Sequence, residues 1–112
     1  MTDEELVEAL KALAHPVRLR IMQVLTGAER NVGEIDAAAQ VGQPTLSQQL
    51  AVLRNAGLVK TRKDAKLVFY RIDQAKLENV VRATGKLVGQ SAPLTDRPRQ
   101  AAPGVANFAK LG

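Results

Sequence analysis

Hydrophobic residues recur at helical spacing in the first part of the chain and predict two helices there. The apolar face of the first helix is formed by Leu6, Leu10 and Leu13, at intervals of four and three residues. Residues 2–5, with the sequence TDEE, have the pattern of a capping box and would begin this helix. His15-Pro16 interrupts it, and because proline suits a first helical turn, we expect a second helix over about residues 16–26.

Two further helices follow, separated by a short turn. Asn31 is a suitable N-cap for a helix over residues 32–39, and Gly42 lies in the turn after it. A fourth helix is expected over about residues 43–56, with Pro44 in its first turn. Its inward face is formed by Leu46, Leu50 and Leu53. A tight connection between two such helices is typical of a helix-turn-helix, whose second helix enters the DNA major groove.

After residue 57 the hydrophobic period changes from that of a helix toward that of a strand. Residues 58–63 and 67–72 are rich in β-branched and aromatic residues and flank a short polar link, so they predict a β-hairpin. Asp73 then caps a fifth helix over about residues 74–88.

The fold class predicted is mostly α with a small β-hairpin (α+β), a winged helix-turn-helix in the order α-α-α-α-β-β-α. We expect one domain over residues 1–88 and a flexible tail over 89–112, which holds three of the five prolines.

Charge is distributed unevenly along the chain. Residues 1–53 contain seven acidic and four basic residues, whereas residues 54–71 contain one acidic residue and six basic ones. These six are Arg54, Lys60, Arg62, Lys63, Lys66 and Arg71. A localised basic stripe is typical of a polyanion-binding surface, although an isolated one is more often only a solvated face. Its position beside the helix-turn-helix favours DNA, with Arg54, Arg62, Lys63 and Lys66 on the phosphate backbone and the hairpin acting as a wing.

The fourth helix is almost uncharged on the side opposite its leucines. Turning those leucines inward directs five polar side chains outward near the helix N-terminus, the end that reaches base edges in this motif. The predicted base-reading residues are Gln43, Thr45, Ser47, Gln48 and Gln49. Glutamine pairs with adenine, and serine and threonine are short, adaptable partners. We therefore interpret the helix as a recognition helix rather than an ordinary exposed one.

Other function classes have little support in the sequence. The chain has no cysteine, one histidine, no nucleophile–base pair and no phosphate-binding glycine loop, so an enzyme is not expected. A winged helix that docks an acidic protein is the alternative, but its recognition helix lacks the aromatic anchors of such interfaces. No window approaches the roughly 18 apolar residues of a membrane span, and the acidic start is unlike a secretory signal. We expect a cytoplasmic protein that does not bind membranes.

The segments LKALAHPVRLRIMQVL, VGEI, QPTLSQQLAVLRNAGLV and TRKDAKLVFYRI are collinear over about residues 5–88. In this order they resemble the ArsR/SmtB family of bacterial winged-helix repressors, and LSQQL with the hairpin is similar to its BigR/HlyU-like group. The resemblance implies a homodimer formed by the first and last helices, bound to a pseudo-palindromic double-stranded operator and repressing a nearby operon. The interface residues expected are Leu6, Leu10, Leu13, Leu77, Val80, Val81, Thr84 and Leu87.

The sensing residues of that family do not carry over. Its members respond to metals through Cys, His and carboxylate clusters, or, in the BigR-like group, to oxidation of a cysteine pair. Gln23 stands where one of those cysteines would lie, and the chain has no thiol at all. Asp73 and Glu78 have no histidine companion in the last helix, so we expect no metal and no cofactor, and His15 is interpreted as a structural residue. An organic effector, an unrecognised carboxylate site and constitutive binding remain open, so the effector is unknown.

Overall fold

The computed structural model describes residues 1–89. Residues 90–112, and with them nearly all of the tail expected over 89–112, lie outside the described residues. No helix within residues 1–89 is long and apolar enough to cross a membrane.

The first two helices begin and end close to where their capping signals predict. Helix α1 spans Asp3–Leu13, and its capping box is present: Thr2 Oγ1 accepts a hydrogen bond from the Glu5 amide, and Glu5 Oε1 accepts one from the Thr2 amide. Helix α2 spans Pro16–Val24, two residues shorter than expected. The side chain of His15 is its N-cap, because Nδ1 accepts a hydrogen bond of 3.2 Å from the Val17 amide.

The helix-turn-helix consists of α3 (Val32–Ala39) and α4 (Thr45–Asn55). Asn31 caps α3 in a reciprocal pair with Glu34, as the sequence predicts. In the turn, Oδ1 of Asp36 accepts a hydrogen bond of 2.8 Å from the amide of Gly42, whose φ of 87° favours glycine. Helix α4 begins at Thr45 rather than near Gln43, so the turn is slightly longer than expected.

The sheet has three antiparallel strands in the order β1-β3-β2: β1 (Arg30–Asn31), β2 (Val59–Asp64) and β3 (Leu67–Ile72). The predicted hairpin is β2–β3. Strand β1 was not expected, because two residues are too few to show a period; it is defined by its pairing with β3, which places Arg30 opposite Tyr70. Helix α5 (Gln74–Gly85) follows, with Asp73 as its N-cap, and ends in a 3₁₀ turn, η1 (Lys86–Val88).

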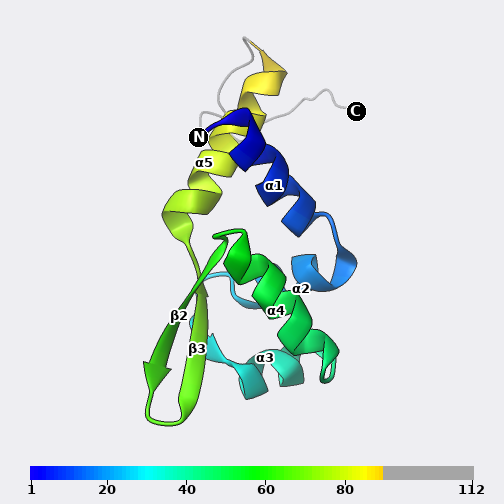
Figure 1. Ribbon diagram of the computed structural model, residues 1–112, viewed down its shortest axis with the longest axis vertical. Coiled ribbons are helices and arrows are strands. Elements are labelled where there is room, and N and C mark those ends of the chain that lie inside the picture. Colours follow the sequence, from blue (N-terminus) through cyan, green and yellow to red (C-terminus); the bar gives the residue numbers. More distant parts are fainter. Residues whose placement is uncertain (90–112) are drawn as a thin grey trace, which may run out of the picture.

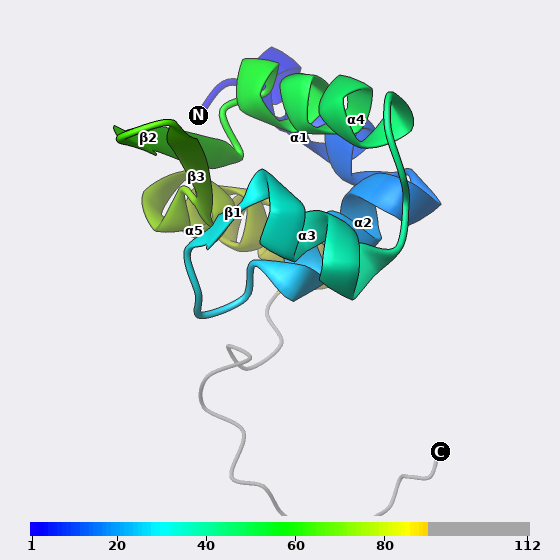
Figure 2. The same cartoon turned by 90° about the horizontal axis from the view of Figure 1, so that it is seen from below.

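The core lies where α2, α3, α4 and the base of the hairpin meet. Its largest fully buried side chains are Ile21, Leu25, Ile35, Leu46, Leu50, Leu53 and Leu58. Figure 1 shows α1 and α5 together at one end, while α3, the α3–α4 turn and the tip of the hairpin lie at the other. Figure 2 looks onto that second end, with α3 in the middle and the hairpin and α4 beside it. The predicted winged helix-turn-helix of the α+β class is confirmed.

Candidate nucleic-acid interface

The outer face of α4 is held in place by its leucines. Leu46, Leu50 and Leu53 are each 1% exposed or less, so the direction of the opposite face is set by the core. Four of the five predicted base-reading side chains are exposed: Gln43, Thr45, Ser47 and Gln48. They lie at the N-terminal end of the helix, as expected from the spacing of the leucines.

Gln43 and Ser47 interact with each other at the start of this face. Oε1 of Gln43 accepts a hydrogen bond of 2.7 Å from Oγ of Ser47 and one of 3.3 Å from the Ser47 amide. The glutamine thus occupies one of the amides that a helix N-terminus leaves without a partner. Its NH₂ group keeps both donors, so the pair presents a preoriented amide to any ligand in front of α4.

Gln49 does not lie with the other four. Its side chain is half-buried, and its Oε1 accepts a hydrogen bond of 2.6 Å from Nη1 of Arg18 on α2. Turning the leucines of α4 inward was expected to direct Gln49 outward as well, but Gln49 is turned by about 100° from Gln48 about the helix axis. Gln49 therefore faces the body of the protein, and the outward set is reduced to four residues.

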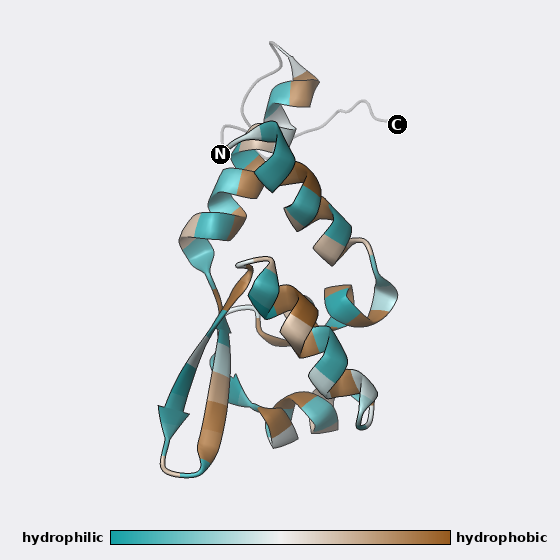
Figure 3. Cartoon of the chain, in the orientation of Figure 1, coloured by the Kyte–Doolittle hydropathy of each residue, from teal (hydrophilic) through white to brown (hydrophobic). Residues whose placement is uncertain are grey.

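The hairpin carries its charge unevenly. Figure 3 shows that β2 is mainly hydrophilic while β3 is more apolar toward the tip. Arg54, Lys63 and Lys66 are exposed, and none of them has an ion pair within the described part of the chain. Their charges are therefore available to a polyanion, in agreement with the charge pattern of the sequence.

Arg62 is engaged differently from these three. Glu29, in the loop before β1, lies 2.7 Å from its Nη2 and 3.2 Å from its Nε, and Asp64 lies 3.6 Å from Nη1. The guanidinium also lies over the ring of Phe69, 4.8 Å from the centroid. The hydrogen bonds from Arg62 lower the pKa of the Glu29 carboxyl, because they favour its ionised form.

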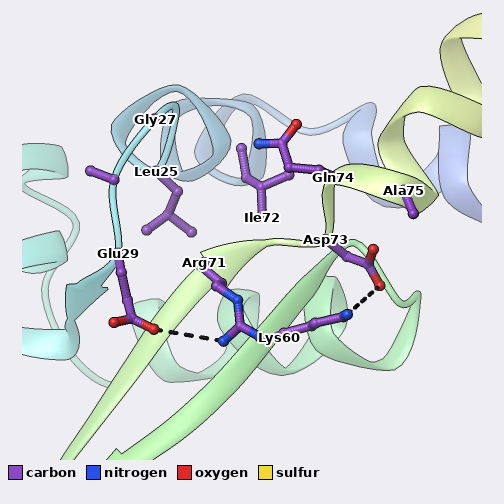
Figure 4. A pocket seen from close by; sticks show the side chains of 10 residues that line it. Leu25, Gly27, Glu29, Lys60, Arg71, Ile72, Asp73, Gln74 and Ala75 are labelled. Carbon is purple, nitrogen blue, oxygen red and sulfur yellow. Dashed lines mark ion pairs between the residues drawn. The ribbon is translucent and has the colours of Figure 1, made fainter.

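Two further bases of the block are paired at the foot of the wing. A cavity of about 400 Å³ opens there, with Leu25 and Ile72 in its lining. Figure 4 shows the two ion pairs at this cavity: Arg71 with Glu29 at 3.6 Å, and Lys60 with Asp73 at 3.9 Å. Within residues 1–89, the basic stripe of the sequence is thus divided into partly neutralised charges at the base of the wing and charges without an ion pair at Arg54 and the hairpin tip.

The arginines of the first half of the chain bind helix ends. Arg18 donates to the carbonyl oxygens of Lys11 and Ala12 at the end of α1. Arg20 donates to Ala39 O at the end of α3, and Arg30 to Val24 O at the end of α2. Because the last carbonyls of a helix have no partner within it, these cations satisfy them and suit its negative end. The sequence offered no signal for these roles.

The residues expected at a dimer interface differ in how deeply they are buried in the protomer. Val80 is 4% exposed, and Leu6, Leu13 and Leu77 pack against the core, so these four stabilise the protomer itself. Thr84 is half-buried and donates its hydroxyl to Val80 O. Leu10, Val81 and Leu87 are exposed, as are Val7 and Val88, which were not in the predicted set. The outer apolar surface of α1, α5 and η1 is formed by Val7, Leu10, Val81, Leu87 and Val88.

The positions considered for sensing do not come together. Gln23 is exposed, and within residues 1–89 no group of three or more histidine, aspartate or glutamate side chains could hold a metal ion. His15 caps α2, in line with the interpretation that it is structural.

Comparison with known proteins supports this arrangement. Residues 15–61 match the model of the family described as "Bacterial regulatory protein, arsR family". The Biofilm growth-associated repressor of Xylella fastidiosa is 48% identical over 79 residues, covering 70% of this chain and 69% of the relative. Transcriptional activator HlyU of Vibrio cholerae is 39% identical over 85 residues, covering 76% and 79%.

A solved structure agrees with these matches. The crystal structure of the transcriptional repressor BigR from Xylella fastidiosa is 41% identical, with a TM-score of 0.62, and the match covers 82% of this chain and all of that one. This chain is therefore similar in sequence to these proteins over most of its length. The similarity agrees with its fold, its basic wing and the exposed polar face of α4. The chain belongs to the ArsR family of bacterial regulatory proteins, and it is a transcriptional regulator rather than an enzyme.

Proposed function

We propose that this protein is a homodimeric, sequence-specific repressor of a nearby operon, acting in the cytoplasm on double-stranded DNA. The observation that carries the proposal is the exposed polar set at the N-terminal end of α4, formed by Gln43, Thr45, Ser47 and Gln48. No carboxylate lies among them to repel phosphate, and each has a donor or acceptor that suits a base edge.

Three exposed cations without an ion pair in the described part of the chain, Arg54, Lys63 and Lys66, follow this face in the sequence. Arg54 is at the far end of α4, and Lys63 and Lys66 lie near the hairpin tip, where they would follow the backbone or the minor groove. Arg62 is proposed as a secondary backbone contact, because Glu29 already holds it. One relative is named a repressor and another a transcriptional activator. We propose repression for this protein because the repressor is the more similar of the two in sequence.

A homodimer is supported by the outer apolar surface of α1, α5 and η1. Val81, in α5, is 53% exposed and Leu87, in η1, is 85% exposed. Figure 1 shows α5 and α1 at the end of the molecule away from the hairpin tip. Pairing there would remove this surface from water and leave both recognition helices free. Two recognition helices related by a two-fold axis fit a pseudo-palindromic site with half-sites about 34–36 Å apart.

The test is a set of binding isotherms of the purified protein on DNA from upstream of its own gene and on a scrambled duplex of equal length. We expect tighter binding to the upstream site than to the scrambled duplex at physiological salt. For each tenfold rise in salt concentration, the logarithm of the binding constant should fall by about 0.9 for every neutralised phosphate. Equal binding to both duplexes would overturn the proposal. A fluorescence reporter behind the same DNA should rise when the gene is deleted if the protein is a repressor.

The proposal also takes residues 1–88 as the DNA-binding and dimerisation unit and 89–112 as a flexible tail. A chain that ends at residue 88 should then form the same dimer and bind the same duplex with unchanged selectivity. A truncated chain that stays monomeric, or that no longer distinguishes the two duplexes, would show that the tail belongs to the unit.

A further inference from the structure

Arg18 joins two helices that have different functions in the proposed dimer. Its Nε donates a hydrogen bond of 2.6 Å to Ala12 O and its Nη2 one of 3.3 Å to Lys11 O, both at the C-terminal end of α1. Its Nη1 donates one of 2.6 Å to Oε1 of Gln49 on α4. The side chain is half-buried, and Gln49 lies 31 residues away along the chain.

The geometry of the guanidinium makes this contact directional. Arginine presents its donors in a planar fork, so two bonds to the end of α1 fix where the remaining nitrogen points. The position is favourable in itself, because a cation at a helix C-terminus meets carbonyls that lack partners. Arg20 and Arg30 cap the ends of α3 and α2 in the same way, but their hydrogen bonds within the described residues do not extend to α4.

Gln49 lies at the edge of the buried stripe of α4. Leu46 and Leu50 hold the helix against the core, yet apolar contacts are non-directional and tolerate small rotations about the helix axis. A hydrogen bond to a charged donor in a half-buried place resists such a rotation. Because Ser47 and Gln48 are the preceding residues of the same helix, any rotation at Gln49 would redirect them.

We infer that the Arg18–Gln49 hydrogen bond is a positioning contact: it ties the C-terminal end of α1 to α4 and sets the direction in which Ser47 and Gln48 are presented to DNA. This inference rests on the proposed function for its DNA-binding part. Gln49 acts through Arg18 and touches no base. Arg18 of α2 thereby links the helix at the proposed dimer interface to the recognition helix through a single side chain.

Three variants separate positioning from base reading. Gln49→Met keeps the length of the side chain and removes the acceptor; Gln49→Glu keeps an acceptor for Arg18; Gln48→Glu places the same charge on the exposed neighbour. We expect Gln49→Met to lower the ratio of operator to scrambled-DNA affinity by about tenfold, the scale of one lost bond to a charged group. Its affinity for scrambled DNA should stay unchanged, because Arg54, Lys63 and Lys66 are intact.

The two glutamate variants should differ from each other. Gln49→Glu should hold operator affinity within about threefold of the wild type, because its charge is paired with Arg18. Gln48→Glu should lose about tenfold or more, because its carboxylate would face DNA. If Gln49→Glu loses as much as Gln48→Glu, Gln49 lies against DNA and the inference is wrong. It is equally wrong if Gln49→Met is as selective as the wild type.

A measurement without DNA tests the bond separately from the proposed function. Urea unfolding midpoints of Arg18→Met, Gln49→Met and the double variant should be non-additive, the double variant losing less than the sum of the two single losses. Arg20→Met combined with Gln49→Met is the matched control and should be additive. Additive losses for Arg18 and Gln49 would overturn the inference. Failure of the wild type to prefer its operator would instead overturn the proposed function and leave this unfolding result standing.

Discussion

Glu29 binds Arg62 through two nitrogen atoms of the guanidinium, with Oε1 2.7 Å from Nη2 and 3.2 Å from Nε. The two residues are 33 positions apart, so this contact joins the loop before β1 to the outer strand of the wing. The same carboxylate lies 3.6 Å from Arg71 on β3. Glu29 thereby braces the wing against the helical body and reduces the positive charge at its base.

The first prediction concerns pH. The hydrogen bonds from Arg62 lower the pKa of Glu29 in the folded protein below its unfolded value. Such a group contributes stability that is present above the unfolded pKa and is lost as the pH falls through the folded pKa. We expect the urea midpoint of Glu29→Gln to fall less than that of the wild type when the pH is lowered from 6 to below the ordinary pKa of a glutamate, because the variant lacks this carboxyl.

Glu78→Gln is the control for this experiment. Glu78 is an exposed glutamate of α5 that has no ion pair within the described residues. Its replacement should leave the acid dependence close to that of the wild type. If the urea midpoints of Glu29→Gln and the wild type depend on pH in the same way, the contact of Glu29 with Arg62 does not stabilise the protein.

The second prediction separates base reading from backbone contact. Gln48→Ala should relax sequence choice, at a cost of about 1–3 kcal/mol at one base position, because the bidentate amide is lost. Lys63→Ala should weaken binding to all sequences alike and reduce the salt slope by about one unit. Isotherms on single-base operator variants at two salt concentrations measure both effects. A uniform loss for Gln48→Ala would mean that its amide binds phosphate instead.

The third prediction concerns the dimer. Val81 is 53% exposed in the protomer, so glutamate there is solvated in a monomer and would be buried and unpaired in a dimer formed by α1 and α5. Val81→Glu should sediment as a folded monomer with a native circular-dichroism spectrum. Leu19→Glu, on α2 and 47% exposed, should sediment as the wild type does. A dimeric Val81→Glu protein would place the interface elsewhere.

The fourth prediction tests His15 as an N-cap. His15→Ala removes the acceptor of the Val17 amide and should destabilise the protein by about 0.5–2 kcal/mol. His15→Asn should retain most of the stability, because its Oδ1 takes a place similar to that of Nδ1. Urea unfolding measures both. An unfolding free energy for His15→Ala equal to that of the wild type would show that the cap is not stabilising.

Local signals in the sequence were sufficient for the elements and for the exposed face of α4. The capping boxes of Thr2 and Asn31, the N-cap Asp73 and the leucines of α4 all act over three or four residues, so their effect can be read from neighbouring positions. Resemblance over long, collinear segments then indicated the family. The outward direction of Gln48 follows from the same spacing.

Contacts between distant residues depended on tertiary structure. Strand β1 exists through its pairing with β3, and Val80 is buried because α5 packs against the rest of its own chain. Gln49 and Arg62 each had the right chemistry for DNA, yet Arg18 and Glu29 hold them. A sequence shows which side chains can form a hydrogen bond or ion pair, whereas the packing of helices and strands decides which partner is within reach.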